Sequence, residues 1–398
     1  METRAGDPGA FAHFDLGRVD SPAFVVDVAR LRANLAVLAD VRDRAGIKVL
    51  AAMKAFSMWK VAPVIAEYLD GVCTSGLWEA RLAQEHYAGG EIATYCAGYK
   101  AEDLPEICAI SDHVIFNSPG QIVRFRQVLD AQGAGFDIGL RINPQHAEGE
   151  VPRYDPCAPH SRLGFPVEQL RAEHLAGVTG LHMHTLCEQD FAPLQRTWEA
   201  VRPKIAPYFG QLKWLNFGGG HHITRDDYQR DELVDFLRGV KAETGCEIYL
   251  EPGEAVALDA GILVGTILDA HWNGMPLAIT DISATCHMPD VIEAPYRPAM
   301  LGERAEPEGA LVDDPSDGAV RLGGPSCLAG DVIGDYRLPG PCEPGQRFAF
   351  LDQAHYSMVK TTTFNGVPLP SIWLWDSAND SLECVRRFGW EAFRDRLS

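Results

Sequence analysis

The chain has 398 residues, 46% hydrophobic and 23% charged, so it can bury one large core or two ordinary ones without disulfide support. Its 35 Lys and Arg against 55 Asp and Glu give a formal net charge of −20, which opposes broad binding to nucleic acid. The sequence shows no membrane-spanning apolar run and no apolar leader, and its 10 cysteines form no CxxC pair. We therefore expect a cytoplasmic protein without structural zinc.

The first β-rich run in the chain, residues 23–27, precedes the first helical pattern. Eight further runs then alternate with amphipathic segments such as 77–87, 191–205 and 231–244. Strand–helix alternation over roughly 210 residues is typical of a (β/α)8 barrel, whose active site lies at the C-terminal ends of its strands. A doubly wound open sheet is the alternative. The eight predicted barrel strands are residues 47–52, 71–75, 92–97, 113–117, 136–142, 178–184, 212–217 and 247–250.

The sequence changes in character beyond residue 260, where helical periodicity fades and glycine and proline become frequent. Short strand-like runs at 277–281, 346–351 and 371–375 predict a second, mostly antiparallel β domain. The early run at 23–27 is left over from the barrel count, so we expect it to add a strand to this second domain.

These patterns predict a barrel domain at residues 28–262 and a β domain made of residues 1–27 and 263–398. The stretch 303–318 is rich in acids, glycine and proline, and it predicts an exposed, mobile loop.

A lysine follows the first predicted barrel strand. Lys54 stands between Met53 and the pair Ala55 and Phe56. A lysine among apolar neighbours at a strand end is expected to be partly desolvated, which favours a neutral amine that can form a Schiff base. A lysine that extends its charged end into water is the alternative.

Two histidines, His182 and His184, lie at the end of the sixth predicted strand. Alternate residues of a strand point to the same side, so both imidazoles can face the barrel mouth. Three interpretations remain: a metal-binding pair, an aromatic side chain stacked on a planar cofactor, or ordinary polar residues at the rim.

Gly218, Gly219 and Gly220 follow the seventh predicted strand. Consecutive glycines expose backbone N–H groups without side-chain obstruction, and the loops after strands seven and eight of such barrels commonly bind phosphate. A flexible turn would have the same sequence, but the position favours a phosphate site.

Glu251 follows the eighth predicted strand, beside Pro252 and Gly253. A carboxylate here could pair with a protonated ring nitrogen or could serve only as an acid at a helix N-terminus. Taken together, a lysine, an imidazole, a glycine turn and a carboxylate at one barrel mouth match the needs of pyridoxal phosphate.

The chain resembles the alanine racemase-like barrel class of pyridoxal-phosphate enzymes and, within it, the carboxynorspermidine/carboxyspermidine decarboxylases. The resemblance spans both predicted domains, from about residue 22 to residue 373. The matching stretches are residues 53–59 (MKAFSMW), 180–189 (GLHMHTLCEQ), 213–223 (KWLNFGGGHHI), 250–256 (LEPGEAV), 284–290 (ATCHMPD), 296–298 (YRP), 322–336 (LGGPSCLAGDVIGDY) and 355–366 (HYSMVKTTTFNG).

The resemblance implies a decarboxylase of polyamine biosynthesis that uses pyridoxal 5'-phosphate and makes norspermidine or spermidine from the carboxylated precursor. By resemblance, Lys54 forms the Schiff base, His184 stacks against the ring and Glu251 contacts the pyridine nitrogen. The three glycines and Tyr356 would hold the phosphate.

Cys327 matches, by the same resemblance, the cysteine that returns a proton after carbon dioxide leaves. In this class the turn that carries the cysteine reaches the active site of the other protomer. The implied working unit is therefore a homodimer with shared active sites, in which the β domain completes the active site and forms the dimer interface.

Two departures from the wider decarboxylase pattern bear on the substrate. Glu254 stands where diaminopimelate and ornithine decarboxylases usually have arginine, and Leu328 stands where an acid usually follows the cysteine. Both changes disfavour a second substrate carboxylate and favour a distant amine. The predicted substrate contacts are Glu254, Asp290, Arg297 and Asp331.

Several alternatives remain open at this stage. The chain could decarboxylate another basic amino acid, namely diaminopimelate, ornithine or arginine. It could also be an amino-acid racemase, a non-enzymatic pyridoxal-phosphate carrier, or a metal-dependent barrel hydrolase. The last alternative would use His182, His184, His221 and His222 around zinc. The choice between carboxynorspermidine and carboxyspermidine is also open.

Overall fold

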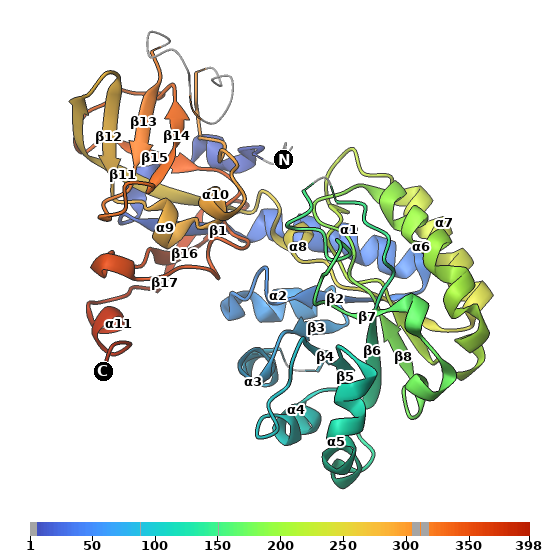
Figure 1. The fold of residues 1–398 in the computed structure, drawn as a ribbon. Helices are drawn as coiled ribbons and strands as arrows, with labels where there is room; N and C mark the ends of the chain where they lie inside the picture. The colour runs from blue at the N-terminus through green and yellow to red at the C-terminus, as the bar shows by residue number, and fades with distance from the viewer. Residues whose placement is uncertain (1–5, 88, 150, 305–310, 312–317) are drawn as a thin grey trace. The chain divides into compact units, whose positions relative to one another are not determined.

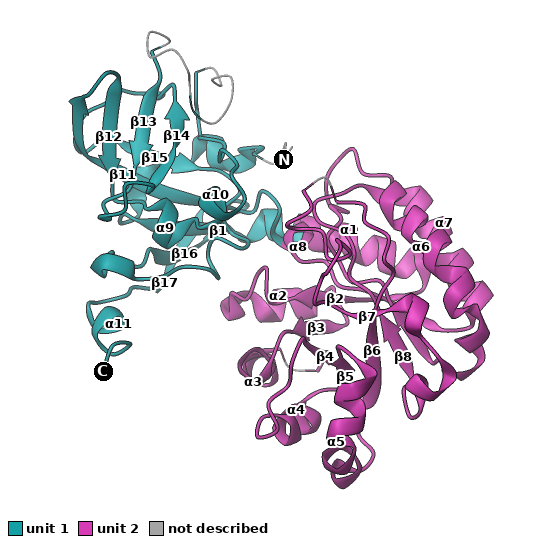
Figure 2. Ribbon diagram, in the orientation of Figure 1, with its two compact units in different colours: residues 1–32, 257–398 teal, residues 33–256 magenta. Residues whose placement is uncertain are grey.

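The computed structural model describes residues 6–87, 89–149, 151–304, 311 and 318–398. The chain forms two compact units (Figure 2), one made of residues 33–256 and the other of residues 1–32 with 257–398. The predicted domain boundaries stay predictions. So does the expectation that the β domain completes the active site and forms the dimer interface. Most of the stretch 303–318, predicted to be a mobile loop, lies outside the described residues.

The unit of residues 33–256, the barrel unit, contains a closed barrel of eight parallel strands (Figure 1), which confirms the predicted (β/α)8 fold. The strands are β2 (Lys48–Ala52), β3 (Gly71–Thr74), β4 (Glu91–Cys96), β5 (His113–Phe116), β6 (Asp137–Asn143), β8 (Gly180–His182), β9 (Trp214–Asn216) and β10 (Glu247–Leu250). Strand β10 pairs with β2, and β6 pairs with both β5 and β8, so the ring has no free edge. A short strand, β7 (Phe165–Pro166), pairs with β6 outside the ring.

Helices follow most of these strands and surround the barrel (Figure 1). The segment between β6 and β8 differs, because its described residues form β7 and two short 3-10 helices. The α-helices up to residue 257 are α1 (Val28–Ala45), α2 (Ala62–Ala66), α3 (Leu77–His86), α4 (Leu104–Ile110), α5 (Pro119–Gln132), α6 (Phe191–Ile205), α7 (Arg230–Thr244) and α8 (Glu254–Ala257).

Local sequence explains where these helices begin, end and pack. Helix α6 buries Leu194, Trp198 and Val201 on one face, which is the spacing of an amphipathic helix. The side chain of Ser118 accepts a hydrogen bond from the first turn of α5 and so begins that helix. Gly245 adopts a left-handed conformation and ends α7.

A cluster of polar side chains surrounds Glu91 near the N-terminal ends of the barrel strands, opposite the predicted active site. Glu91 forms an ion pair with Lys48, accepts a hydrogen bond from the Tyr249 hydroxyl at 2.9 Å and lies 3.4 Å from His113 Nε2. Burial opposes ionisation of Glu91, but these partners outweigh burial and lower its pKa to about 2. Since the unfolded value is about 4.3, the ionised group stabilises the fold at neutral pH, and this contribution is lost as the pH falls towards 2.

We expect Glu91→Gln to lower the free energy of unfolding at pH 7 by about 2 kcal/mol. The difference from the unmodified protein should narrow as the pH falls from about 5 to about 2, because Glu91 takes up a proton in the unfolded chain at a higher pH than in the folded protein. Urea unfolding at pH 7 and pH 3 measures this. Glu106→Gln, in an exposed pair with Arg81, is the control and should change stability much less. A difference that stays constant with pH would contradict the assignment.

The other unit, residues 1–32 with 257–398, is called the β unit. It is built on one sheet of eight strands, in which β1 (Ala23–Asp27) lies between an antiparallel β11 and a parallel β16. This confirms the predicted mostly antiparallel β fold and the extra strand at 23–27. The other strands are β11 (Gly261–Trp272), β12 (Pro276–Thr280), β13 (Val320–Gly323), β14 (Val332–Tyr336), β15 (Arg347–Phe350), β16 (Ser371–Asp376) and β17 (Ser381–Arg386).

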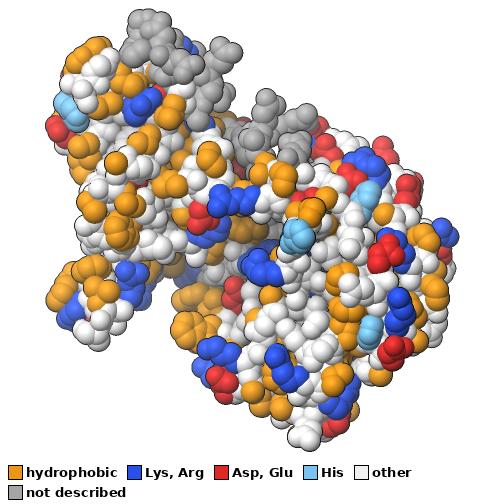
Figure 3. Space-filling view, in the orientation of Figure 1, with side chains coloured by type: hydrophobic (Ala, Val, Ile, Leu, Met, Phe, Trp, Pro, Cys, Tyr) orange, Lys and Arg blue, Asp and Glu red, His pale blue; other side chains and the backbone are white. Residues whose placement is uncertain are grey.

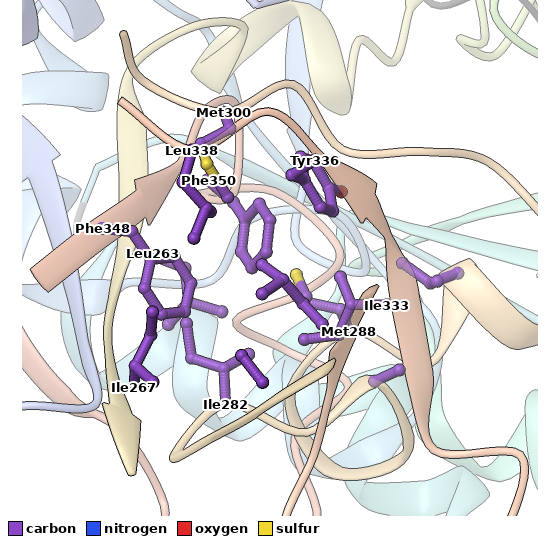
Figure 4. Packing of buried hydrophobic residues seen from close by; sticks show 14 of the residues in the cluster. Leu263, Ile267, Ile282, Met288, Met300, Ile333, Tyr336, Leu338, Phe348 and Phe350 are labelled. Atoms are coloured by element: carbon purple, nitrogen blue, oxygen red, sulfur yellow. The ribbon is translucent and has the colours of Figure 1, made fainter. Parts of the chain in front are cut away.

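The core of this unit packs between β11–β15 and the short helix α9 (Ala284–His287) with the residues around it (Figure 4). Leu263 and Ile267 of β11 meet Phe350 of β15 and Met288, all almost fully buried. Burial of such side chains contributes about 2 kcal/mol each. This core holds the hairpin of β13 and β14 that carries Cys327.

The described helices include none that is both long and apolar enough to cross a lipid bilayer. On the visible face of the barrel unit, acidic and basic side chains are interspersed (Figure 3). The net charge of −20 is therefore not gathered into a single acidic patch on that face.

Candidate active site at the barrel mouth

Lys54 lies just beyond β2, at the C-terminal end of the barrel strands. Hydrogen bonds from Ala52 N–H to the Pro252 carbonyl and from Met53 N–H to the Cys73 carbonyl hold the backbone there. The neighbours of Lys54 are buried as predicted, but its own side chain is exposed, so the predicted partial desolvation of the lysine is wrong in this structure.

His184 lies between Lys54 and the glycine turn. Its Nε2 is 3.3 Å from Lys54 Nζ, and its Nδ1 accepts a hydrogen bond of 3.0 Å from the Gly219 N–H. Burial, followed by the positive charges of Lys54 and Arg141, holds the pKa of His184 well below its usual value. The imidazole is therefore neutral, and the accepted bond at Nδ1 places its proton on Nε2.

The turn at Gly218, Gly219 and Gly220 packs too closely for any other residue. A Cβ at Gly219 would lie 2.1 Å from the Glu251 carbonyl oxygen, and one at Gly220 would lie 1.9 Å from the Leu186 carbonyl oxygen. Gly218 and Gly220 also have positive φ angles of 67° and 90°, which favour glycine. The glycines therefore allow the loops after β8, β9 and β10 to approach one another.

Two of the three amides predicted to face phosphate are already engaged. Gly218 N–H donates to Asn216 Oδ1 at 2.8 Å, and Gly219 N–H donates to His184. The expectation that all three N–H groups are unobstructed is therefore wrong for these two. Close packing directs them at side chains of the barrel instead, and Gly220 supplies the remaining amide of the turn.

Glu251 lies at the end of β10 and is held by two donors. His182 Nε2 lies 3.1 Å from one carboxylate oxygen, and Asn216 Nδ2 donates to the other at 2.7 Å. Burial opposes ionisation of Glu251, but His182 and Asn216 outweigh it and lower its pKa. Burial also lowers the pKa of His182, so the pair consists of a neutral imidazole and an ionised carboxylate.

A chain of hydrogen bonds and close polar contacts thus joins the four predicted groups. It runs from Lys54 through His184 to the glycine turn, and from the turn through Asn216 to Glu251. The structure brings together at one barrel mouth an amine, a neutral imidazole, a tight glycine turn and a carboxylate anion. This arrangement can hold a flat ring that carries a reactive carbonyl, a basic nitrogen and a phosphate.

Sequence reasoning missed the residues that support these groups. Asn216 acts on both sides, because its oxygen accepts from the turn while its nitrogen donates to Glu251. Arg141, buried in β6, donates to the His184 carbonyl at 3.1 Å and lies over the Tyr95 ring. That ring stacks on His182 at 5.5 Å. A polar residue at the end of an otherwise apolar strand, as in WLN of β9, was the available signal.

The four histidines of the metal alternative do not converge. His182 binds Glu251 and His184 contacts Lys54, whereas His221 binds the Tyr228 hydroxyl at 2.6 Å and His222 binds Glu254 at 2.8 Å. Within the described ranges, no three metal-ligating side chains form a group that could hold an ion. The geometry therefore favours the cofactor interpretation over a zinc hydrolase.

Cys327 and Tyr356 belong to the β unit. Cys327 is the exposed member of the ten cysteines, all of which are free thiols, and its N–H donates to Asn365 Oδ1 at 2.7 Å. Tyr356 has a left-handed backbone with φ of 45°. Such a conformation costs of order 1 kcal/mol for a residue other than glycine and is typical of functional positions.

The predicted substrate contacts each have a protein partner. Glu254 binds His222, Asp290 forms an ion pair with Lys360, and Arg297 is buried against Glu303. Asp331, in the β unit, is buried among hydroxyl and amide donors. The roles of these four residues toward a substrate stay predictions.

Comparison with known proteins agrees with this geometry. The model of the alanine racemase N-terminal domain matches residues 26–203. A carboxynorspermidine/carboxyspermidine decarboxylase of Campylobacter jejuni is 37% identical over 94% of this chain and 98% of its own length. A carboxyaminopropylagmatine decarboxylase of Synechocystis is 38% identical, with 96% of each chain covered.

A solved structure supports the same relationship. The crystal structure of carboxynorspermidine decarboxylase from Campylobacter jejuni, complexed with norspermidine, superposes with a TM-score of 0.85. It covers 95% of this chain and 100% of its own, at 36% identity.

Proposed function

The chain belongs to the family of carboxynorspermidine/carboxyspermidine decarboxylases, and we propose that it decarboxylates carboxynorspermidine or carboxyspermidine with pyridoxal 5'-phosphate. The observation that carries the proposal is the series of polar contacts from Lys54 through His184, the glycine turn and Asn216 to Glu251. The products would be norspermidine or spermidine.

The residues at the barrel mouth fit pyridoxal phosphate. Lys54 would hold the cofactor covalently through Nζ, and His184 would lie against its ring. Gly220, within a turn where no Cβ fits, would meet the phosphate together with Tyr356. Glu251, ionised and held from two sides, would keep a proton on the ring nitrogen. When bound, the cofactor supplies an electron acceptor that allows carbon dioxide to leave.

The protein's own groups then have distinct tasks. The neutral His184 places an apolar ring face beside Lys54 and adds no charge that would compete with the lysine. The Glu251 carboxylate would hold a proton at the nitrogen of a bound pyridine ring and so favour the developing negative charge that such a ring accepts. The Cys327 thiol, the predicted acid, returns a proton to the carbon that has lost its carboxyl.

We further propose a homodimer in which Cys327 serves the active site of the other protomer. The proposal comes from the family resemblance, and the exposure of the Cys327 side chain on its own unit supports it. A cytoplasmic location is supported by the ten free thiols. We propose no membrane or nucleic-acid partner.

For the substrate, we propose a cationic carboxylated polyamine. Glu254 and Asp290 are the acids that we assign to its distal amine. The similar identity to a carboxyaminopropylagmatine decarboxylase makes a guanidinium-bearing substrate the second candidate. A guanidinium is planar and binds carboxylates through two parallel hydrogen bonds, so the two substrates need different acid geometries.

Carbon dioxide release from a panel of substrates tests the proposal. With pyridoxal phosphate present, we expect kcat/KM for carboxynorspermidine or carboxyspermidine to exceed that for diaminopimelate, ornithine and arginine by about a hundredfold or more. Carboxyaminopropylagmatine belongs in the same panel. A higher kcat/KM for carboxyaminopropylagmatine would move the assignment to the second candidate, and a preference for diaminopimelate would contradict the proposal.

A further inference from the structure

Cys327 lies in the loop that joins β13 to β14. The base of this loop is closed by two backbone hydrogen bonds, from Gly324 N–H to the Asp331 carbonyl at 2.9 Å and from Asp331 N–H to the Leu328 carbonyl at 3.0 Å. Cys327 and Leu328 are exposed at its tip. An exposed loop tip moves unless other groups hold it, and a proton donor has to reach its acceptor within hydrogen-bond distance.

Asp331 holds the base of the loop from inside. Its side chain is 4% exposed, and its Oδ2 accepts hydrogen bonds from Ser326 Oγ at 2.6 Å and from Ser283 Oγ at 2.8 Å. Its Oδ1 accepts from Thr285 N–H at 3.2 Å. A Cβ at Gly324 would lie 2.3 Å from Oδ2, so the loop packs directly onto this carboxylate. Asp331 is thus committed to the loop and to the start of α9.

Helix α9 connects this carboxylate to a second anchor. Ser283 caps α9 by accepting from Cys286 N–H at 3.0 Å while it donates to Asp331. At the other end of α9, the Cys286 carbonyl accepts from Thr362 N–H at 2.8 Å and His287 Nε2 binds the Pro368 carbonyl at 3.0 Å. Residues 362–368 are therefore fastened to α9 at both ends.

The fastened segment reaches back to Cys327. Asn365 lies within it, with a left-handed φ of 61°, and its Oδ1 accepts the Cys327 N–H at 2.7 Å. Hydrogen bonds to Asp331 fix the base of the loop, and the hydrogen bond to Asn365 fixes its tip. Both sets of contacts depend on α9. This gives a structural role to residues 284–287 (ATCH) and 361–366 (TTTFNG), to which the sequence alone assigns no chemistry.

We propose that Asp331 and Asn365 are positioning residues, which act through α9 to fix the place of the Cys327 thiol, and that Asp331 does not bind the substrate amine. The proposal rests on the proposed function of Cys327 as proton donor. A displacement of about 1 Å of such a group costs up to a hundredfold in rate. Loss of the contacts made by Asp331 or Asn365 should therefore lower kcat and leave substrate binding unchanged.

Variants at Asn365 test its contact with the loop tip. Asn365→Gly removes the acceptor but keeps the left-handed backbone free of strain, whereas Asn365→Asp keeps both. In the enzyme loaded with pyridoxal phosphate, we expect the glycine variant to lose about tenfold in kcat with KM within about twofold, and the aspartate variant to retain kcat. Asn379→Gly, at an exposed turn of the same unit, is the matched control and should leave kcat unchanged.

A double-variant cycle separates positioning from a general structural role. In a Cys327→Ala background, Asn365→Gly should have no further effect on kcat, because its effect passes through the thiol. A loss of kcat that persists without Cys327, or an unchanged kcat in the single glycine variant, would overturn the positioning role.

Asp331→Asn tests the contacts of Asp331 with the base of the loop. An amide of the same shape loses one acceptor, so we expect kcat to fall about tenfold or more while KM stays within about twofold. A rise in KM with kcat unchanged would show instead that Asp331 binds the substrate and would overturn this part of the proposal. Thermal unfolding of each variant shows whether the fold is retained.

The rate of Cys327 alkylation by iodoacetamide, followed by mass spectrometry, tests positioning without activity. Cys327 is exposed on its own unit but would be covered by the partner's active site in the proposed homodimer. We expect the rate to rise about threefold in Asn365→Gly, because the freed loop tip would leave that site more often. An unchanged rate would overturn the positioning role. If Cys327→Ala retains full kcat, the proposed proton donor is wrong, and the alkylation rate still decides whether Asn365 fixes the loop.

Discussion

Replacing Lys54 with alanine is expected to lower kcat by about a thousandfold or more, because the variant loses the amine that would hold the cofactor. Lys54 Nζ is the amine beside His184, and it is joined through that imidazole to the glycine turn. Added pyridoxal phosphate should also no longer give the visible absorbance of a Schiff base. Carbon dioxide release and an absorbance titration measure the two effects.

Lys60→Ala is the matched control, since Lys60 is an exposed lysine in the segment that follows the same strand. It should keep both kcat and the Schiff-base absorbance. Because the Lys54 side chain is exposed, its removal should leave thermal unfolding nearly unchanged. A Lys54→Ala protein that still forms the Schiff base would disprove the assignment of this lysine.

Replacing Glu251 with glutamine is expected to lower kcat by about a hundredfold, because the carboxylate charge that would hold a proton on the ring nitrogen is lost. The new amide also presents N–H groups to His182 and Asn216, both of which donate to the carboxylate. KM should change far less than kcat, since the group acts on the charge that develops during the reaction. Steady-state kinetics at saturating cofactor measures both.

Glu247→Gln offers a control on the same strand. Glu247 lies at the opposite end of β10 and pairs with Lys241, so its replacement should leave kcat unchanged. Glu251→Asp, which keeps the charge, should retain more activity than the glutamine variant. A glutamine variant with full kcat would rule out a role for the charge.

Much of the fold could be predicted because its signals are local and repeated. Each barrel strand is a short apolar run between amphipathic segments, and each of the eight predicted runs overlaps one observed strand. The strand β1 was predicted by counting, since the run at 23–27 exceeded the number that the barrel needs. Family resemblance then added residue roles that periodicity cannot provide.

The candidate site was predictable only at the strand ends. Lys54, His184 and Glu251 stand at C-terminal strand ends, where barrel chemistry is expected. Their partners come from other strands, so the pairing of Glu251 with His182 and Asn216 depends on register and packing that the sequence does not display. The exposure of Lys54 was mispredicted for the same reason, because its neighbours along the chain are buried while its own side chain is exposed.

Asp331 illustrates a second limit. As an acid near the matched cysteine, it was a reasonable partner for a substrate amine. Its carboxylate is instead surrounded by donors from Ser283, Thr285 and Ser326, two of them more than forty positions away in the chain. Only the packed structure shows that its hydrogen-bonding capacity is already used.

The place of β1 has a consequence for how the chain reaches its native state during translation. β1 leaves the ribosome before the barrel strands, yet its neighbours β11 and β16 follow the barrel in the chain. The barrel strands, by contrast, all emerge in one continuous stretch and can close while synthesis continues. The strand AFVVD therefore cannot pair with β11 and β16 until the chain has been made up to residue 376, so the β sheet forms after the barrel strands have been synthesised.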